Sequence, residues 1–206
     1  EQPPQNQAPS VSNVIISPSL PTSTDSLSLS YSYSDSDGDL ESGTTIQWSR
    51  DSSIITQLDD SSSVSSSFLS KGETWTVTVT PSDGTDSGSP VSSAPIIVQN
   101  TPPVVNSLSI SPTDPTELDD LTISYSFSDS DLDSESGTII QWYLDGSRVS
   151  TYDGVSTIPN VSTRTGDIWE VRITPSDGED SGNVVTASIQ IGSSNNAPSI
   201  QSLTIT

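Results

Sequence analysis

The side chains in this sequence whose type and spacing could do chemistry are carboxylates grouped in short segments. One segment, Asp35–Gly43, carries four of them at alternate positions, and residues 129–137 repeat the pattern. We call these the long acidic loops. A second segment, Asp83–Gly88, recurs as residues 177–182, and we call these the short acidic loops. The candidate ligands are Asp35, Asp37, Asp39, Glu41, Asp83, Asp86, Asp129, Asp131, Asp133, Glu135, Asp177 and Asp180.

Alternate residues of an extended chain point to one face, so neighbouring carboxylates in a long acidic loop would lie ~6–7 Å apart. Each neighbouring pair would repel by roughly 0.6 kcal/mol at the dielectric of water and by about 2.5 kcal/mol at an effective dielectric near 20. A hard cation would offset this repulsion, and calcium, with its flexible shell of oxygen ligands, fits better than octahedral magnesium. We therefore expect calcium. An EF-hand is excluded, because Leu40 and Ile46 stand where that loop needs Gly and Glu.

A second explanation of the acidic loops is that they are simply solvated, or that they reflect adaptation to high salt. The four loops hold 13 of the 27 acidic residues, at matching positions, which favours a specific role. Composition alone does not separate calcium binding from salt adaptation, and both explanations stay open.

The overall composition excludes several classes of function. Five Lys and Arg against 27 Asp and Glu give a formal net charge of -22, which repels nucleic acid and anionic membranes. No apolar run is long enough to insert into a membrane in this segment. The chain has no His or Cys, and acids in polar loops lack the apolar pocket that raises the pKa of a general acid. We expect a protein that is not an enzyme.

An internal repeat of 94 residues organises the chain. Trp48 and Trp142 are 94 residues apart, as are Trp75 and Trp169, and the Pro-Ser-Asp-Gly motif at residues 81–84 recurs in the same register. Within each repeat, apolar residues alternate with Ser or Thr, which is the pattern of half-buried strands. In the first repeat we expect strands near Val11–Ile16, Leu27–Tyr33, Thr45–Arg50, Thr74–Thr80 and Val91–Val98, with the Ser-rich stretch Ser61–Ser67 poorly marked.

These features predict an all-β fold with two tandem immunoglobulin-like β-sandwich domains plus one extra C-terminal strand. A lone strand carrying Ile200, Leu203 and Ile205 cannot bury its apolar face, so either the repeat array continues or the strand is donated to a neighbouring subunit. The expected boundaries are an N-terminal segment at 1–7, repeat 1 at 8–99, a linker at 100–102, repeat 2 at 103–193, and the first strand of a third repeat or a donated strand at 194–206.

The motif Pro-Ser-Asp-Gly-x-Asp-Ser-Gly after a Trp-bearing strand, followed by a strand and Asn-x-x-Pro, resembles tandem cadherin-like or polycystic-kidney-disease-type repeats of prokaryotic cell-surface proteins. The resemblance implies an extracellular structural, adhesive or spacer role, often with calcium. The linker motifs of cadherins are not reproduced residue for residue. In an immunoglobulin-like sandwich both acidic loops of repeat 2 would meet beside the linker, residues 99–103, where a cation would stiffen a link already restricted by two prolines.

Two other features have alternative interpretations. The four Trp could be platforms for sugar stacking, but they fall in phase with the apolar face of their strands, so we expect them in the core. Asn160-Val161-Ser162 matches an N-glycosylation acceptor, which makes Asn160 a candidate glycosylation site.

We therefore expect an extracellular or cell-surface structural protein: a subunit of a filament, stalk or surface array, with calcium-stiffened repeats and possible strand donation between subunits. Its expected partners are copies of itself, with surface glycans as a further candidate. The alternative is an adhesin or a carbohydrate- or partner-binding module from a larger secreted protein. An exposed aromatic patch on one domain only would favour that alternative. An accessory domain of a large secreted enzyme is a third hypothesis.

Overall fold

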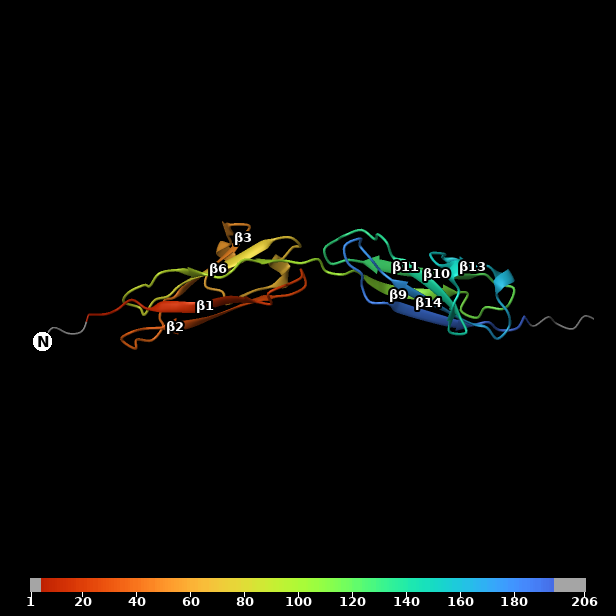
Figure 1. The fold of residues 1–206 in the computed structure, drawn as a ribbon, viewed down its shortest axis with the longest axis horizontal. Coiled ribbons are helices and arrows are strands. Elements are labelled where there is room, and N and C mark those ends of the chain that lie inside the picture. The colour runs from red at the N-terminus through yellow and green to blue at the C-terminus, as the bar shows by residue number, and fades with distance from the viewer. Residues whose placement is uncertain (1–4, 195–206) are drawn as a thin grey trace, which may run out of the picture. The chain divides into compact units, whose positions relative to one another are not determined.

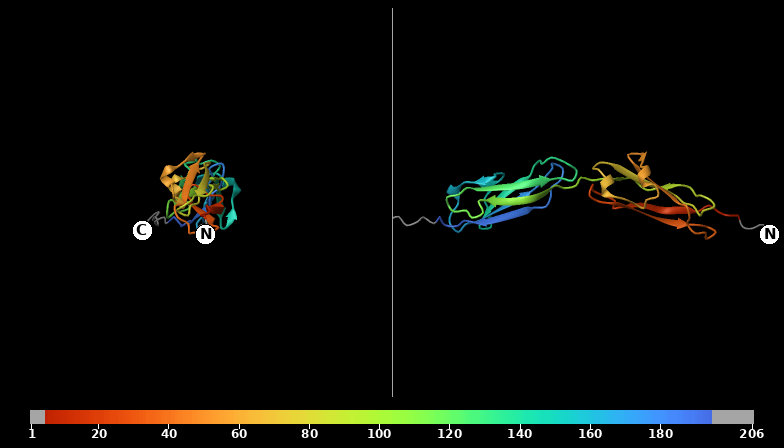
Figure 2. Two further views of the ribbon diagram at one scale, coloured as in Figure 1. Left: turned by 90° about the vertical axis from the view of Figure 1, so that its left-hand side faces the viewer. Right: turned by 180° about the vertical axis from the view of Figure 1, so that it is seen from behind.

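The computed structural model describes residues 5–194 and divides the chain into two compact units, Glu1–Thr101 and Pro102–Thr206 (Figure 1). Each unit consists of two antiparallel sheets (Figure 2). The expected extra strand, residues 194–206, lies outside the described residues except for Ser194. The described residues include no helix long and apolar enough to cross a membrane.

In the first unit, one sheet has the order β1-β2-β5 and the other the order β4-β3-β6-β7, with β8 also paired to β6. The strands are β1 (Ser10–Ser17), β2 (Leu27–Ser34), β3 (Thr45–Arg50), β4 (Ser53–Ile54), β5 (Ser63–Val64), β6 (Thr74–Thr80), β7 (Val91–Ser92) and β8 (Ile96–Ile97). Two short 3₁₀ helices, η1 (Thr56–Leu58) and η2 (Ser66–Phe68), lie between β4 and β6.

The second unit repeats this topology, with sheets β9-β10-β13 and β12-β11-β14-β15. Its elements are β9 (Val104–Ser111), β10 (Leu121–Ser128), β11 (Ile139–Leu144), β12 (Ser147–Arg148), η3 (Ser150–Tyr152), β13 (Thr157–Ile158), η4 (Asn160–Ser162), β14 (Ile168–Thr174) and β15 (Val185–Gln190). The expected tandem sandwich of immunoglobulin-like type is confirmed. The fourth strand pairs with the third, whereas in a constant-type immunoglobulin domain it completes the first sheet.

Alternation of apolar and small polar residues builds both cores. Trp48 and Trp75 are fully buried and meet edge to face with ring centroids 6.4 Å apart. Trp142 and Trp169 form the same pair at 6.2 Å. Such pairs contribute about 0.5–1.5 kcal/mol beyond the area they bury. The expectation that the four Trp belong to the core is confirmed.

The last strand differs between the repeats. The single strand expected over Val91–Val98 is two short pieces, β7 and β8, whereas β15 runs unbroken. Pro95 stands between the pieces, and proline has no N–H to donate to a ladder. In the second repeat Ile189 pairs with Trp169 as Ile96 does with Trp75, and the residue before it is Ser188, which has an N–H for the ladder, so the pairing continues.

The loop before β6, which contains the Ser-rich stretch Ser61–Ser67, is attached to the core by hydrogen bonds from tryptophan side chains and has only short strands. The indole Nε1 of Trp48 donates to the backbone carbonyl of Ser61 at 2.8 Å, and that of Trp142 donates to Val155 at 2.9 Å. These bonds fix a loop whose Ser-rich sequence carries no strand pattern.

Candidate metal sites

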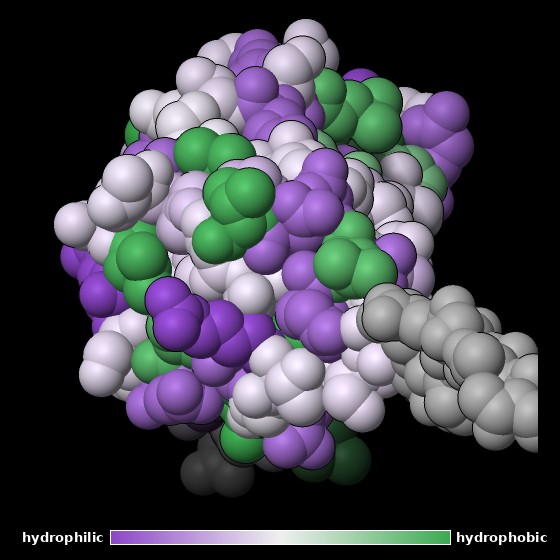
Figure 3. All heavy atoms as spheres, turned by 90° about the vertical axis from the view of Figure 1, so that its right-hand side faces the viewer, coloured by the Kyte–Doolittle hydropathy of each residue, from purple (hydrophilic) through white to green (hydrophobic). Residues whose placement is uncertain are grey.

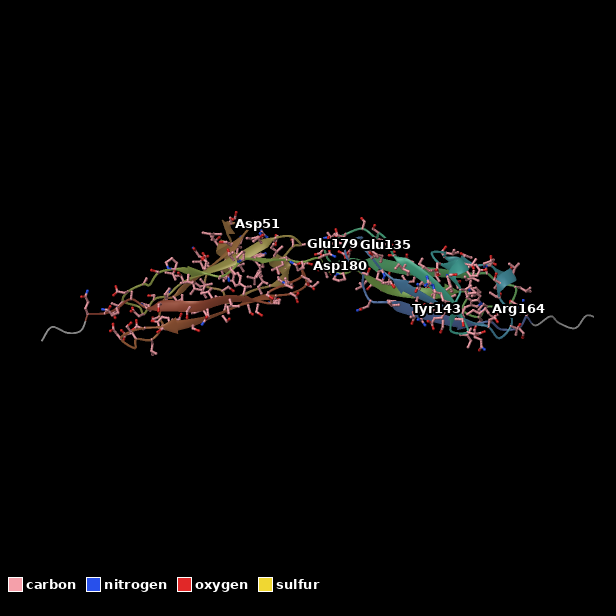
Figure 4. All side chains as sticks on the ribbon, in the orientation of Figure 1. Asp51, Glu135, Tyr143, Arg164, Glu179 and Asp180 are labelled. Carbon is pink, nitrogen blue, oxygen red and sulfur yellow. The ribbon has the colours of Figure 1, made fainter. Side chains whose placement is uncertain are left out.

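The two acidic loops of each repeat lie side by side at one end of their sandwich. The long loop joins β2 to β3 and the short loop follows β6. In the first unit, the N–H of Ser42 donates to the carbonyl of Ser82 at 2.8 Å, and the N–H of Ser82 donates to Thr44 Oγ1 at 3.2 Å. The second unit has the same pair of bonds at the same distances. Figure 4 labels Glu135, Glu179 and Asp180 at this end of the second unit.

Three carboxylates of each long loop converge. Oxygen atoms of Asp35, Asp37 and Asp39 lie within 4.8 Å of one another, and those of Asp129, Asp131 and Asp133 do the same. The extended loop assumed from the sequence is wrong, because Oδ1 of Asp35 accepts the backbone N–H of Asp37 at 2.8 Å and that of Asp39 at 3.1 Å. These bonds fold the loop into a turn around the first aspartate, which we call the curl. The three carboxylates therefore lie closer together than they would along an extended chain.

The second unit forms the same curl. Oδ1 of Asp129 accepts the N–H of Asp131 at 2.7 Å and that of Asp133 at 3.2 Å. The residue after Asp131 is Leu132, which adopts φ +66°, where the first repeat has Gly38 at φ +84°. The left-handed turn is therefore kept in the second repeat although a bulky side chain disfavours it.

One oxygen of the first aspartate in each triad lacks a protein partner. Oδ2 of Asp35 and Oδ2 of Asp129 are shielded from solvent and accept no hydrogen bond from any described residue. A buried acceptor without a partner costs about 1–3 kcal/mol, and more when it is charged. A cation would satisfy it.

The donor set fits calcium. All three side chains supply hard carboxylate oxygens, and calcium–oxygen bonds of about 2.3–2.6 Å allow ligands up to ~5 Å apart across the ion. Oxygen atoms within 4.8 Å of one another can therefore share one ion. In the first unit, a hollow lined by Gln5, Asn6, Asp37 and Asp39 adjoins the triad and leaves room for carbonyl or water ligands.

In the first unit, the two aspartates of the short acidic loop accept hydrogen bonds from the side-chain amide of Asn6. Nδ2 of Asn6 donates to Oδ2 of Asp83 at 3.0 Å and to Oδ2 of Asp86 at 2.9 Å. This bond from Asn6 is the main reason why the pKa of Asp83 lies below its ordinary value. In the second unit, Oδ1 of Asp177 accepts the N–H groups of Glu179 and Asp180, both at 2.7 Å, as Asp83 does for its own loop.

The two glutamates of the long loops also lie outside the triads. Oε1 of Glu41 accepts the hydroxyl of Tyr31 at 2.8 Å, and Oε1 of Glu135 accepts that of Tyr125 at 2.8 Å. Burial and, second, this hydrogen bond raise the pKa of both tyrosines to about 12. Of the twelve predicted ligands, the structure thus brings six together as two triads and places the other six outside them. Which of them bind an ion stays a prediction.

Sequence reasoning missed Asn6, Tyr31 and Tyr125. The rings of both tyrosines pack against the core of their own sandwich, and their hydroxyls reach the long acidic loop. A signal was present, since Tyr31 and Tyr125 share the 94-residue offset and Asn6 recurs as Asn100.

The candidate glycosylation site lies in η4, away from the acidic loops. Nδ2 of Asn160 donates to the carbonyl of Leu118 at 2.9 Å, and its backbone N–H donates to Oδ1 of Asp120 at 2.7 Å. The amide nitrogen that a glycan would modify therefore has a structural role in the folded repeat. Val161 in the same turn is exposed. Figure 3 shows one end of the second unit, where apolar side chains are dispersed among polar ones.

Comparison with known proteins adds little to this description. No protein-family model matches the sequence, and no curated protein matches it significantly. Among solved structures, the chain is similar to a two-domain fibronectin type-III segment from chicken tenascin, with 14% identity, a TM-score of 0.43, and coverage of 87% of this chain and 98% of that one.

Two further similarities have the same character. Fibronectin(III)-like modules of CbhA from Clostridium thermocellum are 13% identical, with a TM-score of 0.33 and coverage of 91% of this chain and 100% of that one. Three N-terminal domains of the bacteriophage RB49 outer capsid protein Hoc are 20% identical, with a TM-score of 0.35 and coverage of 90% and 59%. At these values the similarities carry no argument about function. The strands themselves define the class: a tandem immunoglobulin-like β-sandwich repeat protein.

Proposed function

We propose that this chain is an extracellular, non-catalytic structural protein whose immunoglobulin-like repeats bind calcium in their long acidic loops. The observation that supports calcium best is the shielded Oδ2 of Asp35 and of Asp129, each without a protein partner and each inside a cluster of three carboxylates. Solvated loops have no reason to bury a charged oxygen that nothing contacts.

Asp35, Asp37 and Asp39 would hold one ion, and Asp129, Asp131 and Asp133 a second. The ion supplies positive charge that offsets the repulsion within each triad. In the first repeat, Oδ2 of Asp37 accepts the N–H of Gln7 at 2.6 Å, so the triad is joined to the segment that enters the sandwich. Binding at the triad would order that segment together with the loop.

If calcium orders the segment that precedes the first strand of each repeat, it also supports a role in assembly. Repeats tied to the chain that precedes them suit a filament, stalk or surface array built from copies of this chain, in keeping with the resemblance to cadherin-like and polycystic-kidney-disease-type repeats. Strand donation by residues 194–206 would be one way to link copies.

The test is calorimetric titration of the full chain with calcium, together with thermal unfolding in calcium and in excess chelator. We expect two ions per chain, and a melting temperature that falls with chelator and recovers with calcium but not with sodium of equal ionic strength. Asp35→Asn and Asp129→Asn keep an oxygen for the loop hydrogen bonds and remove the charge. Each substitution should therefore reduce the number of calcium ions bound per chain from two to one.

The matched controls are Asp59→Asn and Asp114→Asn, which remove the same charge from exposed positions outside the acidic loops. They should leave two ions bound. If wild-type protein binds no calcium, or if sodium restores the melting temperature equally well, salt adaptation is the correct explanation of the acidic loops.

One observation favours the alternative of a binding module. On the exposed face of β11 and β14, the guanidinium of Arg172 lies 4.0 Å from the ring centre of Tyr143, which Figure 4 labels, and pairs with Glu170 at 2.5 Å. The equivalent residues of the first repeat are Ser49 and Thr78. In the first repeat Arg50 lies over Trp75, but that ring is fully buried, so a tyrosine and arginine pair on the outer face is described in the second repeat alone. Such a pair is the pattern of a binding surface. Neutral oligosaccharides that bind the wild type but not Tyr143→Ser would support this candidate.

A further inference from the structure

Glu41 and Glu135 are the fourth carboxylates of the long acidic loops. By sequence alone they are equivalent to the three aspartates that precede them, and as ligands they would give each ion a fourth negative charge. The structure separates them from the triads, since the groups whose oxygens lie within 4.8 Å contain only aspartates.

The same hydrogen bond holds both glutamates. Tyr31 on β2 donates to Glu41 and Tyr125 on β10 donates to Glu135, each at 2.8 Å. Both tyrosine rings pack against the core of their own sandwich, so the hydroxyls are held by a rigid element. Burial of the phenols and the raised pKa of both, about 12, are in keeping with a persistent neutral donor.

The bond lies where the loop returns to the sheet. Glu41 directly precedes Ser42, whose N–H donates to the carbonyl of Ser82 at 2.8 Å, and Glu135 precedes Ser136, which donates to Ser176 at 2.8 Å. The triad is therefore held at its start by the curl around Asp35 or Asp129. At its end it is held by the tyrosine–glutamate bond and the serine bridge.

We propose that Glu41 and Glu135 are positioning residues of the calcium sites and not ligands: their bonds to Tyr31 and Tyr125 anchor the long acidic loops so that three aspartates converge. This inference rests on the proposed calcium binding. From the long loop, each ion then meets three carboxylates and not four. The number of charged ligands is one of the features that set calcium affinity.

The experiment uses the full chain carrying Asp129→Asn, so that calorimetry observes the first site alone. In this background we compare Glu41→Gln, which keeps an oxygen that accepts the Tyr31 hydroxyl, with Glu41→Ala, which removes the anchor. We expect Glu41→Gln to keep calcium affinity within about threefold and Glu41→Ala to lower it by about tenfold or more, the range over which loss of a supporting partner affects a metal site. Asp37→Asn should lower affinity more than either.

A loss of about tenfold in Glu41→Gln, equal to that in Glu41→Ala, would show that the charge itself binds the ion and would overturn the inference. Unchanged affinity in Glu41→Ala would overturn it too, since no anchoring would then be needed. If the Asp129→Asn chain binds no calcium at all, the proposed function has failed, which is a different result. Glu135→Gln and Glu135→Ala in an Asp35→Asn background repeat the comparison at the second site.

Discussion

At the scale of single residues, the two repeats differ beside an otherwise equivalent core tryptophan. The indole Nε1 of Trp75 donates to Oε2 of Glu73 at 3.2 Å, whereas Nε1 of Trp169 is buried with no hydrogen-bond partner among the described residues. The second repeat has Asp167 in place of Glu73. Both carboxylates accept a local backbone N–H, but aspartate is one methylene shorter and does not reach the indole.

Asp167→Glu should therefore stabilise the second repeat. The longer side chain can keep the bond to the N–H of Arg164 and add one to Trp169, which would raise the free energy of unfolding by about 1 kcal/mol. Urea unfolding followed by tryptophan fluorescence measures the change. Glu73→Asp is the converse substitution and should destabilise the first repeat by at least as much, because Glu73 also pairs with Arg50 at 3.3 Å. Equal stability of Asp167→Glu and wild type would mean that Nε1 already has a water partner.

At the scale of elements, one glycine in each repeat brings two segments into backbone contact. A Cβ built on Gly88 would stand 1.8 Å from the carbonyl oxygen of Pro9, and one on Gly182 would stand 1.8 Å from that of Pro103. The segment entering the first sheet therefore packs directly on the segment that follows the short acidic loop. Neither glycine has a positive φ, so the requirement is space and not backbone conformation.

Gly182→Ala should destabilise the second repeat by about 2–3 kcal/mol, because backbone atoms on both sides must move to admit the methyl group. Urea unfolding measures the loss. The control is Gly146→Ala, where no atom lies within 4 Å of the new Cβ and only the positive φ of 80° opposes the substitution, at about 1 kcal/mol. A smaller effect at Gly182 than at Gly146 would contradict the close approach.

At the scale of the whole molecule, the net charge of -22 is large for 206 residues, and only five basic residues oppose it. Repulsion among exposed carboxylates destabilises a folded chain and is screened by salt, whose Debye length falls from about 30 Å at 0.01 M to about 10 Å at 0.1 M.

We therefore expect the melting temperature, measured in excess chelator, to rise by several degrees when sodium chloride is raised from about 0.01 M to about 0.1 M. Choline chloride should have the same effect, because screening depends on ionic strength and not on the cation. A melting temperature that does not change with ionic strength would show that the charges of the acidic side chains are already balanced by nearby groups. Calcium should act at concentrations far too low to change the screening.

Much of this molecule was predictable from the sequence. The 94-residue repeat, the alternating strands around Leu27 and Trp75, and the buried tryptophans follow from periodicity, because side chains in a strand alternate between core and solvent. The break at Pro95 was missed, although the missing N–H of proline could have indicated it. The acidic loops were found as pairs from their matching positions.

The tertiary structure decided how each loop is used. Alternation predicted four equivalent carboxylates along an extended segment, but in the folded loop they have different partners. Oδ1 of Asp35 accepts backbone N–H groups of its own loop, whereas Glu41 accepts the hydroxyl of Tyr31 on the preceding strand. Composition and spacing determine which groups are available and which strands they follow. Which of these groups meet depends on hydrogen bonds that form on folding, both within a loop, as around Asp35, and between segments far apart in sequence, as from Asn6 to Asp83. The long-range bonds depend on how the sheets bring the loops together.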